Sequence, residues 1–402
     1  MRRFILTLAL LGLSAQAAVA KSPLVERYLH SGQLARGEQV LDSALAAAPG
    51  DDQIRFGLGV LQLVRGVERL GQSLYEYGCL SENSSTPFLR IPIPRNPDPS
   101  TISYADFRRV LDGFRSDLAT VELTLAGIKG DNVSLPIRLA EIHFDLTGKG
   151  DANERFIDIL KKLMGQGFRL DAENPEFLVV FDRGDVAWLR AYCHLLMGMI
   201  DFNLAFETES TFYLWADQQF AKPKHRNDVT MEERWAQQQA QWTVIKVAEP
   251  ARLGHFRQHI LKVCELNRET WAFIRAEKDN NFEWLPNPKQ TGVLRMPVTD
   301  EMIDAWLAMV AQTEGLFAGK KAIPAFALQF VSQRQPNEER GMDFKAFLDE
   351  PPDTIDWARI RREGFRDKYL TSTLPDVDIM AFLRVAQAFQ NTLAVGYAAW
   401  FN

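Results

Sequence analysis

Residues 186–206 read VAWLRAYCHLLMGMIDFNLAF, and this stretch decides the fold class. Apolar side chains stand at nearly every position, so a helix formed here is apolar on almost all sides. Such a helix either lies inside a large protein core or spans a membrane. The stretch also carries Arg190, His194 and Asp201, which are costly in a bilayer and favour a core helix. We therefore predict a buried helix, and no membrane span beyond the N-terminal segment.

The sequence on both sides of this stretch continues the helical pattern. Apolar residues recur at three- and four-residue spacing, without the strand-helix alternation that is typical of a doubly wound sheet. Pro, Gly and aromatic residues concentrate in 282–296 and 322–333, which favours short strands or loops there. We predict an all-α fold with a few short strands. The expected helices span 104–128, 135–145, 152–165, 184–206, 208–221, 230–247, 251–278, 300–318 and 376–400.

The composition is that of an ordinary folded protein. The chain has 402 residues, of which 46% are hydrophobic and 24% are charged, so a disordered or collagen-like chain is excluded. The formal net charge is -6, from 46 Lys and Arg against 52 Asp and Glu. Because there is no basic excess, we expect no nucleic acid partner.

The first twenty residues have the pattern of an export signal. Arg2 and Arg3 form a basic head, residues 4–13 are mostly apolar, and small residues lead to Ala20. A membrane anchor is the alternative, but the apolar run is short for a span. We predict a signal peptide at 1–20, cleaved after Ala20, and a periplasmic or secreted protein.

Small and apolar residues repeat at a period of about 34 residues between positions 24 and 78. The first copy contains Leu24, Tyr28, Gly32, Gly37, Leu41, Ala44 and Pro49, and the second contains Leu58, Gly59, Gly66, Gly71, Tyr75 and Gly78. The pattern resembles two tetratricopeptide repeats, although Lys21 and Arg55 replace the aromatic residue of that family. The resemblance implies two helix pairs with a concave groove for a protein or peptide partner.

Prolines divide the chain after this repeat-like unit. Five of them interrupt the helical pattern at Pro87, Pro92, Pro94, Pro97 and Pro99. We predict a larger, irregular helical domain beyond them. The expected organisation is a signal peptide at 1–20, a tetratricopeptide-like unit at 21–81, a proline-rich connection at 82–100 and a helical domain at 101–402.

Residues 145–156 read DLTGKGDANERF and lie between two expected helices. The segment resembles the calcium loop of an EF-hand, with Gly150 at the turn position. Lys149 and Phe156 stand where that family has oxygen ligands, which weakens calcium binding. We predict a structural turn here, with a weak calcium site as the alternative and no other cofactor. The calcium candidates are Asp145, Thr147, Asp151 and Asn153.

Residues 181–197, FDRGDVAWLRAYCHLLM, together with the repeat-like start and the loop at 145–156, suggest a wider likeness. Over most of its length the chain resembles an uncharacterised family of exported bacterial helical proteins. That family implies no known activity. Its members hold acidic or amide residues where this chain has Thr147 and Lys149, so the resemblance carries calcium binding over only in a weakened form.

Three ionisable residues share one face of the apolar helix. At 100° per residue, Arg190, His194 and Asp201 lie close together in rotation about the helix axis. Buried charges need partners or a change of protonation state. We predict a satisfied interhelical network. The alternative is a small polar pocket in which His194 carries protons or binds a metal.

His255 and His259 lie one helical turn apart, at a spacing that allows both rings to reach one zinc ion. The zinc-protease pattern needs a glutamate after the first histidine, and Phe256 stands there instead. A third ligand has to come from elsewhere, for example His143. We therefore favour a solvated helix face and keep zinc as the alternative.

The cysteines and tryptophans favour packing roles. Cys79, Cys193 and Cys264 are predicted to be buried and free, with one disulfide of undetermined pairing as the alternative. Trp235 and Trp242 stand seven residues apart, as core residues of a helix do.

No nucleophile elbow, phosphate loop or Cys-x-x-Cys motif occurs in the sequence. We therefore expect a non-catalytic binding or scaffold protein rather than an enzyme. The alternatives are a metal-dependent hydrolase that uses histidines of the helical domain, and a weak calcium-binding protein.

Overall fold

The computed structural model describes residues 23–83, 87–164, 169–332, 340–389 and 400–401. Within them the fold is mostly helical with a few short strands, which confirms the predicted fold class. The predicted signal peptide lies outside the described residues, as does most of the second half of the helix expected at 376–400. No helix in the described part of the chain is both long and apolar enough to cross a membrane.

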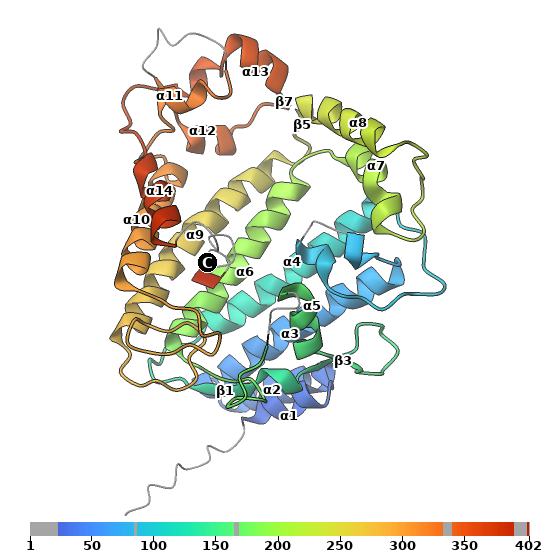
Figure 1. The fold of residues 1–402 in the computed structure, drawn as a ribbon, viewed down its shortest axis with the longest axis vertical. Coiled ribbons are helices and arrows are strands. Elements are labelled where there is room, and N and C mark those ends of the chain that lie inside the picture. The colour runs from blue at the N-terminus through green and yellow to red at the C-terminus, as the bar shows by residue number, and fades with distance from the viewer. Residues whose placement is uncertain (1–22, 84–86, 165–168, 333–339, 390–399, 402) are drawn as a thin grey trace, which may run out of the picture.

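Four long helices form the central layer of the molecule. They lie side by side in the order α9 (Pro250–Ala276), α6 (Arg183–Leu204), α4 (Tyr104–Ala126) and α3 (Asp52–Glu76) (Figure 1). The predicted apolar helix is α6, and it lies between α4 and α9. A helix in this position is covered on two sides, which explains why its sequence is apolar almost all round.

Capping residues set the start of several helices. Ser103 accepts a hydrogen bond from the backbone N–H of Asp106, and the Asp106 carboxylate accepts one from the Ser103 N–H. This capping box confirms the start that the sequence predicts for α4. Asp182 and Asp185 form the same arrangement at the start of α6.

The N-terminal unit consists of α1 (Leu24–His30), α2 (Leu34–Ala47) and α3. The helix pair expected for the second repeat copy is wrong, because α3 runs as one helix of 25 residues. No proline interrupts this segment, and its glycines permit close packing instead. A Cβ atom on Gly59 would lie 2.4 Å from Leu125 Cδ2 of α4. The family resemblance itself stays a prediction.

Eight short strands form four antiparallel pairs in the described chain. The helix expected at 135–145 is wrong, since Leu135 pairs with Phe181 in an extended segment that includes Pro136. Proline lacks the N–H that a helix interior needs. The pairs are β1 (Leu135–Arg138) with β4 (Leu178–Phe181), β2 (His143–Phe144) with β3 (Glu154–Arg155), β5 (Val244–Lys246) with β7 (Thr354–Asp356), and β6 (Gly341–Met342) with β8 (Leu370–Thr371).

Shorter helices surround the central layer. The helix expected at 230–247 ends at Thr243, because the β-branched residues that follow enter β5. The loop expected at 322–333 contains one helical turn, whereas 282–296 has no helix. The remaining helices are α5 (Phe156–Met164), α7 (Glu209–Gln219), α8 (Met231–Thr243), α10 (Asp300–Phe317), α11 (Ala325–Leu328), α12 (Phe344–Asp349), α13 (Trp357–Glu363) and α14 (Ile379–Ala388).

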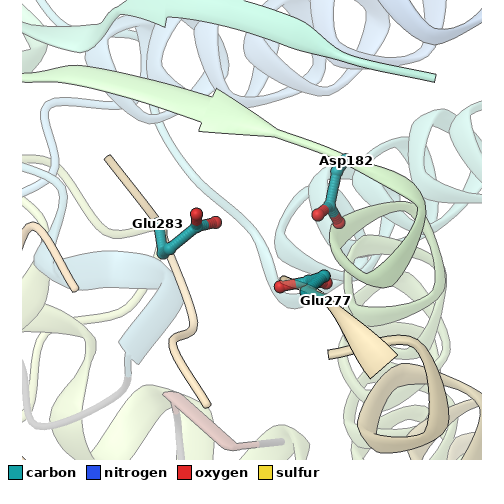
Figure 2. Close-up of side chains that lie close together, drawn as sticks. All are labelled: Asp182, Glu277 and Glu283. Carbon is teal, nitrogen blue, oxygen red and sulfur yellow. The ribbon is translucent and has the colours of Figure 1, made fainter. Parts of the chain in front are cut away.

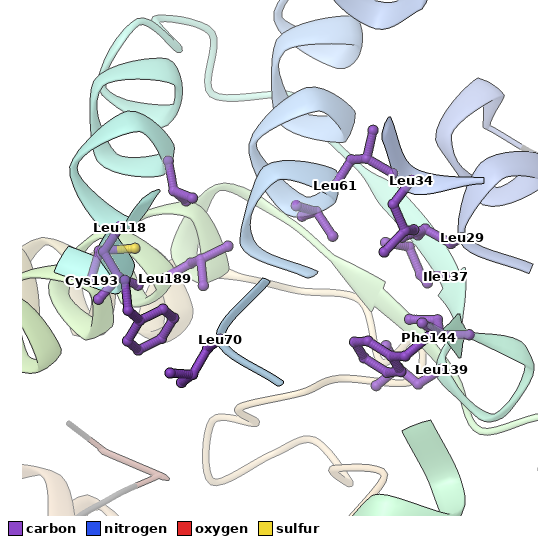
Figure 3. Packing of buried hydrophobic residues seen from close by; sticks show 14 of the residues in the cluster. Leu29, Leu34, Leu61, Leu70, Leu118, Ile137, Leu139, Phe144, Leu189 and Cys193 are labelled. Carbon is purple, nitrogen blue, oxygen red and sulfur yellow. The ribbon is translucent and has the colours of Figure 1, made fainter. Parts of the chain in front are cut away.

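Two large apolar cores meet at the interface between α6 and α9. The first core joins the N-terminal unit to α4 and α6, and Figure 3 shows Leu70, Leu118 and Leu189 within it. The second core contains Trp271 of α9 with residues of α10 and the C-terminal segment. Trp188 of α6 packs against both cores, so the α6–α9 interface connects the two halves of the protein.

The three cysteines are buried and free, so the predicted unpaired state is confirmed. Burial raises the pKa of the Cys79 and Cys264 thiols to about 12, which makes them unreactive at neutral pH. The core role expected for Trp235 and Trp242 is wrong, because they are 54% and 55% exposed on α8.

Candidate functional site

The predicted polar residues of α6 take part in a network with α4 and α9. Glu122 of α4 accepts a hydrogen bond from Arg190 Nη2 at 2.8 Å and lies 3.4 Å from His194 Nε2. Burial raises the pKa of Glu122, but hydrogen bonds from His194 and Arg190 lower it to about 2. The carboxylate therefore stays ionised between two positively charged or hydrogen-bonding partners.

His194 meets a histidine of α9 on its other side. The Nδ1 atoms of His194 and His259 are 2.8 Å apart, and His259 Nε2 lies 3.4 Å from Asp201 Oδ2. His255 is exposed, so the structure separates the two histidines that the sequence pairs as zinc candidates. Sequence reasoning singled out both rings of this pair but missed their contact, because they are 65 residues apart in the chain.

Asp201 forms the second half of the network. Its side chain is completely buried and lies within 2.9 Å of Arg252 Nη1 and 2.8 Å of Arg115 Nε. Arg252 continues the network to Asp112 at 2.9 Å and to Glu249 at 2.6 Å. Burial raises the pKa of Asp201, but the hydrogen bonds from His259 and Arg115 outweigh it and lower the pKa. Arg190, His194 and Asp201 thus all have charged partners.

The segment expected to resemble an EF-hand is a hairpin turn between β2 and β3, not a loop between two helices. Asp145 accepts hydrogen bonds from the backbone N–H groups of Thr147, Gly148 and Gly150. Both glycines have positive φ, which explains the turn without an ion. Lys149 Nζ lies 5.3 Å from the centre of the Tyr75 ring.

The other two calcium candidates contribute little to this turn in the described structure. Asp151 is exposed, and its backbone carbonyl accepts a hydrogen bond from the Asn153 N–H at 2.9 Å. The carboxylate oxygens of Asp145, the remaining candidate with a carboxylate, already accept hydrogen bonds from backbone N–H groups of the turn. Calcium binding at 145–156 stays a prediction.

A second site, which sequence reasoning missed, lies where α6 begins and α9 ends. Asp182, Glu277 and Glu283 each place one carboxylate oxygen within 4.8 Å of the others (Figure 2). We call these three residues the acidic cluster. Among the described residues, this is where three side chains able to bind a metal ion come together. The antiparallel packing of α6 on α9 creates it, because the start of one helix meets the end of the other.

Local hydrogen bonds hold each carboxylate of the acidic cluster in place. Asp182 caps α6 by accepting from the Gly184 N–H at 2.8 Å. Gln290 Nε2 donates to Glu277 Oε2 at 3.2 Å, and the Asn281 N–H donates to Glu283 at 2.6 Å. The three side chains are thus positioned by a helix start, a helix end and a turn.

The acidic cluster lacks positive charge. Within the described chain, none of its three carboxylates forms an ion pair, and neighbouring Arg183 pairs with Glu269 instead. The Oε1 atom of Glu277 is buried without a hydrogen-bond donor. Burial, followed by the negative charge of Asp182, raises the pKa of Glu277 to about 9. Carboxylates in this arrangement require either shared protons or a bound cation.

Two sequence signals pointed weakly to the acidic cluster. Asp182 and Asp185 flank the start of the apolar helix. The segment 277–283 reads EKDNNFE and is rich in oxygen-bearing side chains. Only the helix packing shows that these two segments touch.

A polar pocket of about 590 Å³ lies beside the N-terminal unit. It is lined by the end of α3, by the proline-rich connection and by the turn at 145–150, including Gln72, Glu76, Asn96 and Asp98. Gln72 donates to the Asp145 carbonyl and Asn96 to the Tyr75 carbonyl, both at 2.9 Å. The lining is therefore fixed by internal hydrogen bonds.

The chain matches no family model, no curated protein and no solved structure.

Proposed function

We propose that this protein is a non-catalytic binding protein whose ligand is a divalent cation, calcium, held by the acidic cluster. One observation carries the proposal. Asp182, Glu277 and Glu283 converge without any described cationic partner, and Glu277 Oε1 is buried and unpaired. A cation between them would neutralise the repulsion that otherwise forces a carboxyl group to stay protonated.

The donor set favours calcium over zinc. Calcium prefers six to eight oxygen ligands, and the three carboxylates carry six oxygens, of which three also accept hydrogen bonds. Zinc prefers nitrogen and sulfur ligands, and the acidic cluster contains neither histidine nor cysteine. Magnesium demands octahedral geometry at shorter distances, which suits three loosely spaced carboxylates less well.

The polar network of α6 supports a role in cohesion rather than catalysis. Arg190, His194 and Asp201 each contact a partner on α4 or α9, which supports a packing role for this network. We also propose that the chain is exported to the periplasm or secreted, on the sequence of residues 1–20. Calcium sites of extracellular modules bind with a Kd of about 10⁻⁴–10⁻³ M, which is the affinity we expect here.

Calorimetric titration of the purified protein with calcium, magnesium and zinc tests the proposal. We expect one calcium site and a release of protons, because Glu277 must lose its proton when the cation binds. Buffers of different ionisation enthalpy measure that release. The variants Asp182→Asn and Glu283→Gln should abolish the calcium heat.

The variant Asp145→Asn is the matched control, because it alters the other calcium candidate. We expect it to bind calcium like the natural protein. Loss of binding in Asp145→Asn alone would move the calcium site to the turn at 145–150. Unchanged binding in both acidic-cluster variants would remove the proposal.

The polar pocket favours a second function, the binding of a cationic peptide or protein segment by the N-terminal unit. Glu76 and Asp98 place two carboxylates in its lining, and the guanidinium group of Arg69, which also lines it, is paired with Asp117, so the lining suits a lysine or arginine side chain. Fluorescence anisotropy with lysine-rich and glutamate-rich peptides tests this idea. Binding of the lysine-rich peptide that Asp98→Lys abolishes would support it, and equal binding of both peptides would refute it.

A further inference from the structure

We propose that the exposed tryptophans of α8 form a binding site for an uncharged, β-linked polysaccharide. The site lies away from the acidic cluster and does not depend on cation binding. Trp235 and Trp242 are 54% and 55% exposed, although tryptophan is mostly covered in folded proteins. Large apolar side chains that share an exposed surface mark a place of interaction. The helix that carries them lies at the outer edge of the molecule (Figure 1).

The helix places both indole rings on one face. Trp235 and Trp242 are seven residues apart, which is nearly two full turns of α8 and about 10.5 Å along its axis. Side chains at this spacing leave a helix in nearly the same direction. The separation is about the length of two linked sugar rings in an extended chain, so one straight chain can cover both indoles.

The side chain directly before each exposed tryptophan fixes α8 to α7. Arg234 is buried and donates hydrogen bonds to both carboxylate oxygens of Asp217, at 2.8 and 2.7 Å. Thr211 Oγ1 lies 2.8 Å from Gln241 Oε1 and donates to it. These contacts set the rotation of the helix. The two indole rings therefore lie at the edge of the α7–α8 contact, with about half of their surface exposed.

The surface between the two rings is polar but uncharged. Residues 236–241 read AQQQAQ, and Gln238 and Gln239 lie between the two tryptophans on the same side of the helix. Within the described structure, Gln238 Oε1 is buried without a hydrogen-bond donor, so a ligand hydroxyl group that reaches it gains a partner. Amides donate and accept hydrogen bonds as sugar hydroxyl groups do. The apolar C–H face of a sugar ring, in turn, suits the face of an indole.

The charges of α8 disfavour nucleic acid and anionic lipid as ligands. Glu232 and Glu233 are exposed at the start of the helix, and the guanidinium group of Arg234 is paired with Asp217. Both ligand classes carry phosphate groups, which acidic side chains repel. A proline-rich peptide docks in a groove lined by aromatic residues, whereas these two rings lie along one face of a single helix. A flat, neutral chain with hydroxyl groups fits this face best.

Co-sedimentation with insoluble cellulose and chitin, which are uncharged β-linked polysaccharides, tests the proposal. Starch granules, which are α-linked, serve as the comparison. We expect the natural protein to sediment with cellulose or chitin and to stay in solution with starch. Trp235→Ala and Trp242→Ala should each weaken binding about tenfold, because each removes one of the two rings. The double variant should show no measurable binding.

Phe330→Ala is the matched control, because Phe330 is 88% exposed but lies outside α8. We expect this variant to bind like the natural protein, and circular dichroism checks that every variant is folded. Sedimentation of the natural protein with starch alone, or with none of the three polysaccharides, would overturn the proposal, as would equal binding by the double variant. Binding to phosphatidylcholine vesicles or to a polyproline peptide in place of the polysaccharides would assign the tryptophans to a membrane or a protein partner instead.

Discussion

Replacing Asp201 by alanine should destabilise the protein more than any single change in a surface ion pair. The Asp201 side chain is completely buried and is the shared partner of Arg115, Arg252 and His259. Its removal leaves two guanidinium groups and an imidazole ring between α4, α6 and α9 without their common acceptor. Arg252 keeps Asp112 and Glu249 as partners, whereas Arg115 and His259 lose the carboxylate that faces them.

The expected loss of unfolding free energy is about 3–5 kcal/mol, the cost of breaking a buried ion pair by removing one partner. That is a large part of the total stability of an ordinary domain, about 5–15 kcal/mol. The matched control is Glu82→Ala. Glu82 pairs with Arg95 at 3.3 Å, but the two side chains are 56% and 85% exposed, so the expected change is within about 1 kcal/mol.

Urea unfolding followed by circular dichroism measures both variants. The Asp201→Ala midpoint should fall strongly while the slope of free energy against urea stays constant, which shows that the native state keeps its compactness. A loss below about 1 kcal/mol would mean that Asp201 is solvated in solution. The interpretation of the network as the connection between α4, α6 and α9 would then be wrong.

Other predictions concern packing, pH and the surface. Gly59→Val should cost about 1–3 kcal/mol in urea unfolding, because the new side chain would collide with Leu125; an unchanged midpoint would show that α3 and α4 are loosely packed. The pKa of Glu277 is raised from 4.5 to about 9, so its contribution to stability is complete below about pH 4.5 and is lost as the pH rises from there to about 9. The free energy of unfolding of the calcium-free protein should therefore fall by less than about 1.4 kcal/mol per pH unit between these two values, because solvent screens part of the effect. The variant Glu277→Gln should make the free energy of unfolding less dependent on pH. Trp235→Ser should change the unfolding midpoint little, since this side chain is 54% exposed; a loss above about 2 kcal/mol would show that it is covered in solution.

Local signals in the sequence predict the helices well. The start of α4 at Ser103 follows from a cap and a carboxylate three residues later, and both are present. The predictions of secondary structure fail where the same local pattern is compatible with two different structures. Apolar residues around Pro136 form a strand that pairs with Phe181, because a partner distant in the sequence supplies the hydrogen bonds. The glycines of α3 serve close packing rather than a turn between two helices.

The candidate sites depend on which helices are neighbours, and a single sequence does not specify that. His194 and His259 were each conspicuous, but only the packing of α6 on α9 shows that they share a hydrogen bond. The acidic cluster needs the same packing, since Asp182 and Glu277 lie at opposite ends of these two helices in the chain. Residue types alone therefore predicted some of the participants but not the sites.

The proposed cation site lies between Asp182, Glu277 and Glu283. Anomalous X-ray diffraction from crystals grown with calcium locates the ion directly. We expect an anomalous peak within coordinating distance of these three carboxylates, at about 2.3–2.6 Å. A difference map with no peak there, or with a peak only beside Asp145, would contradict it.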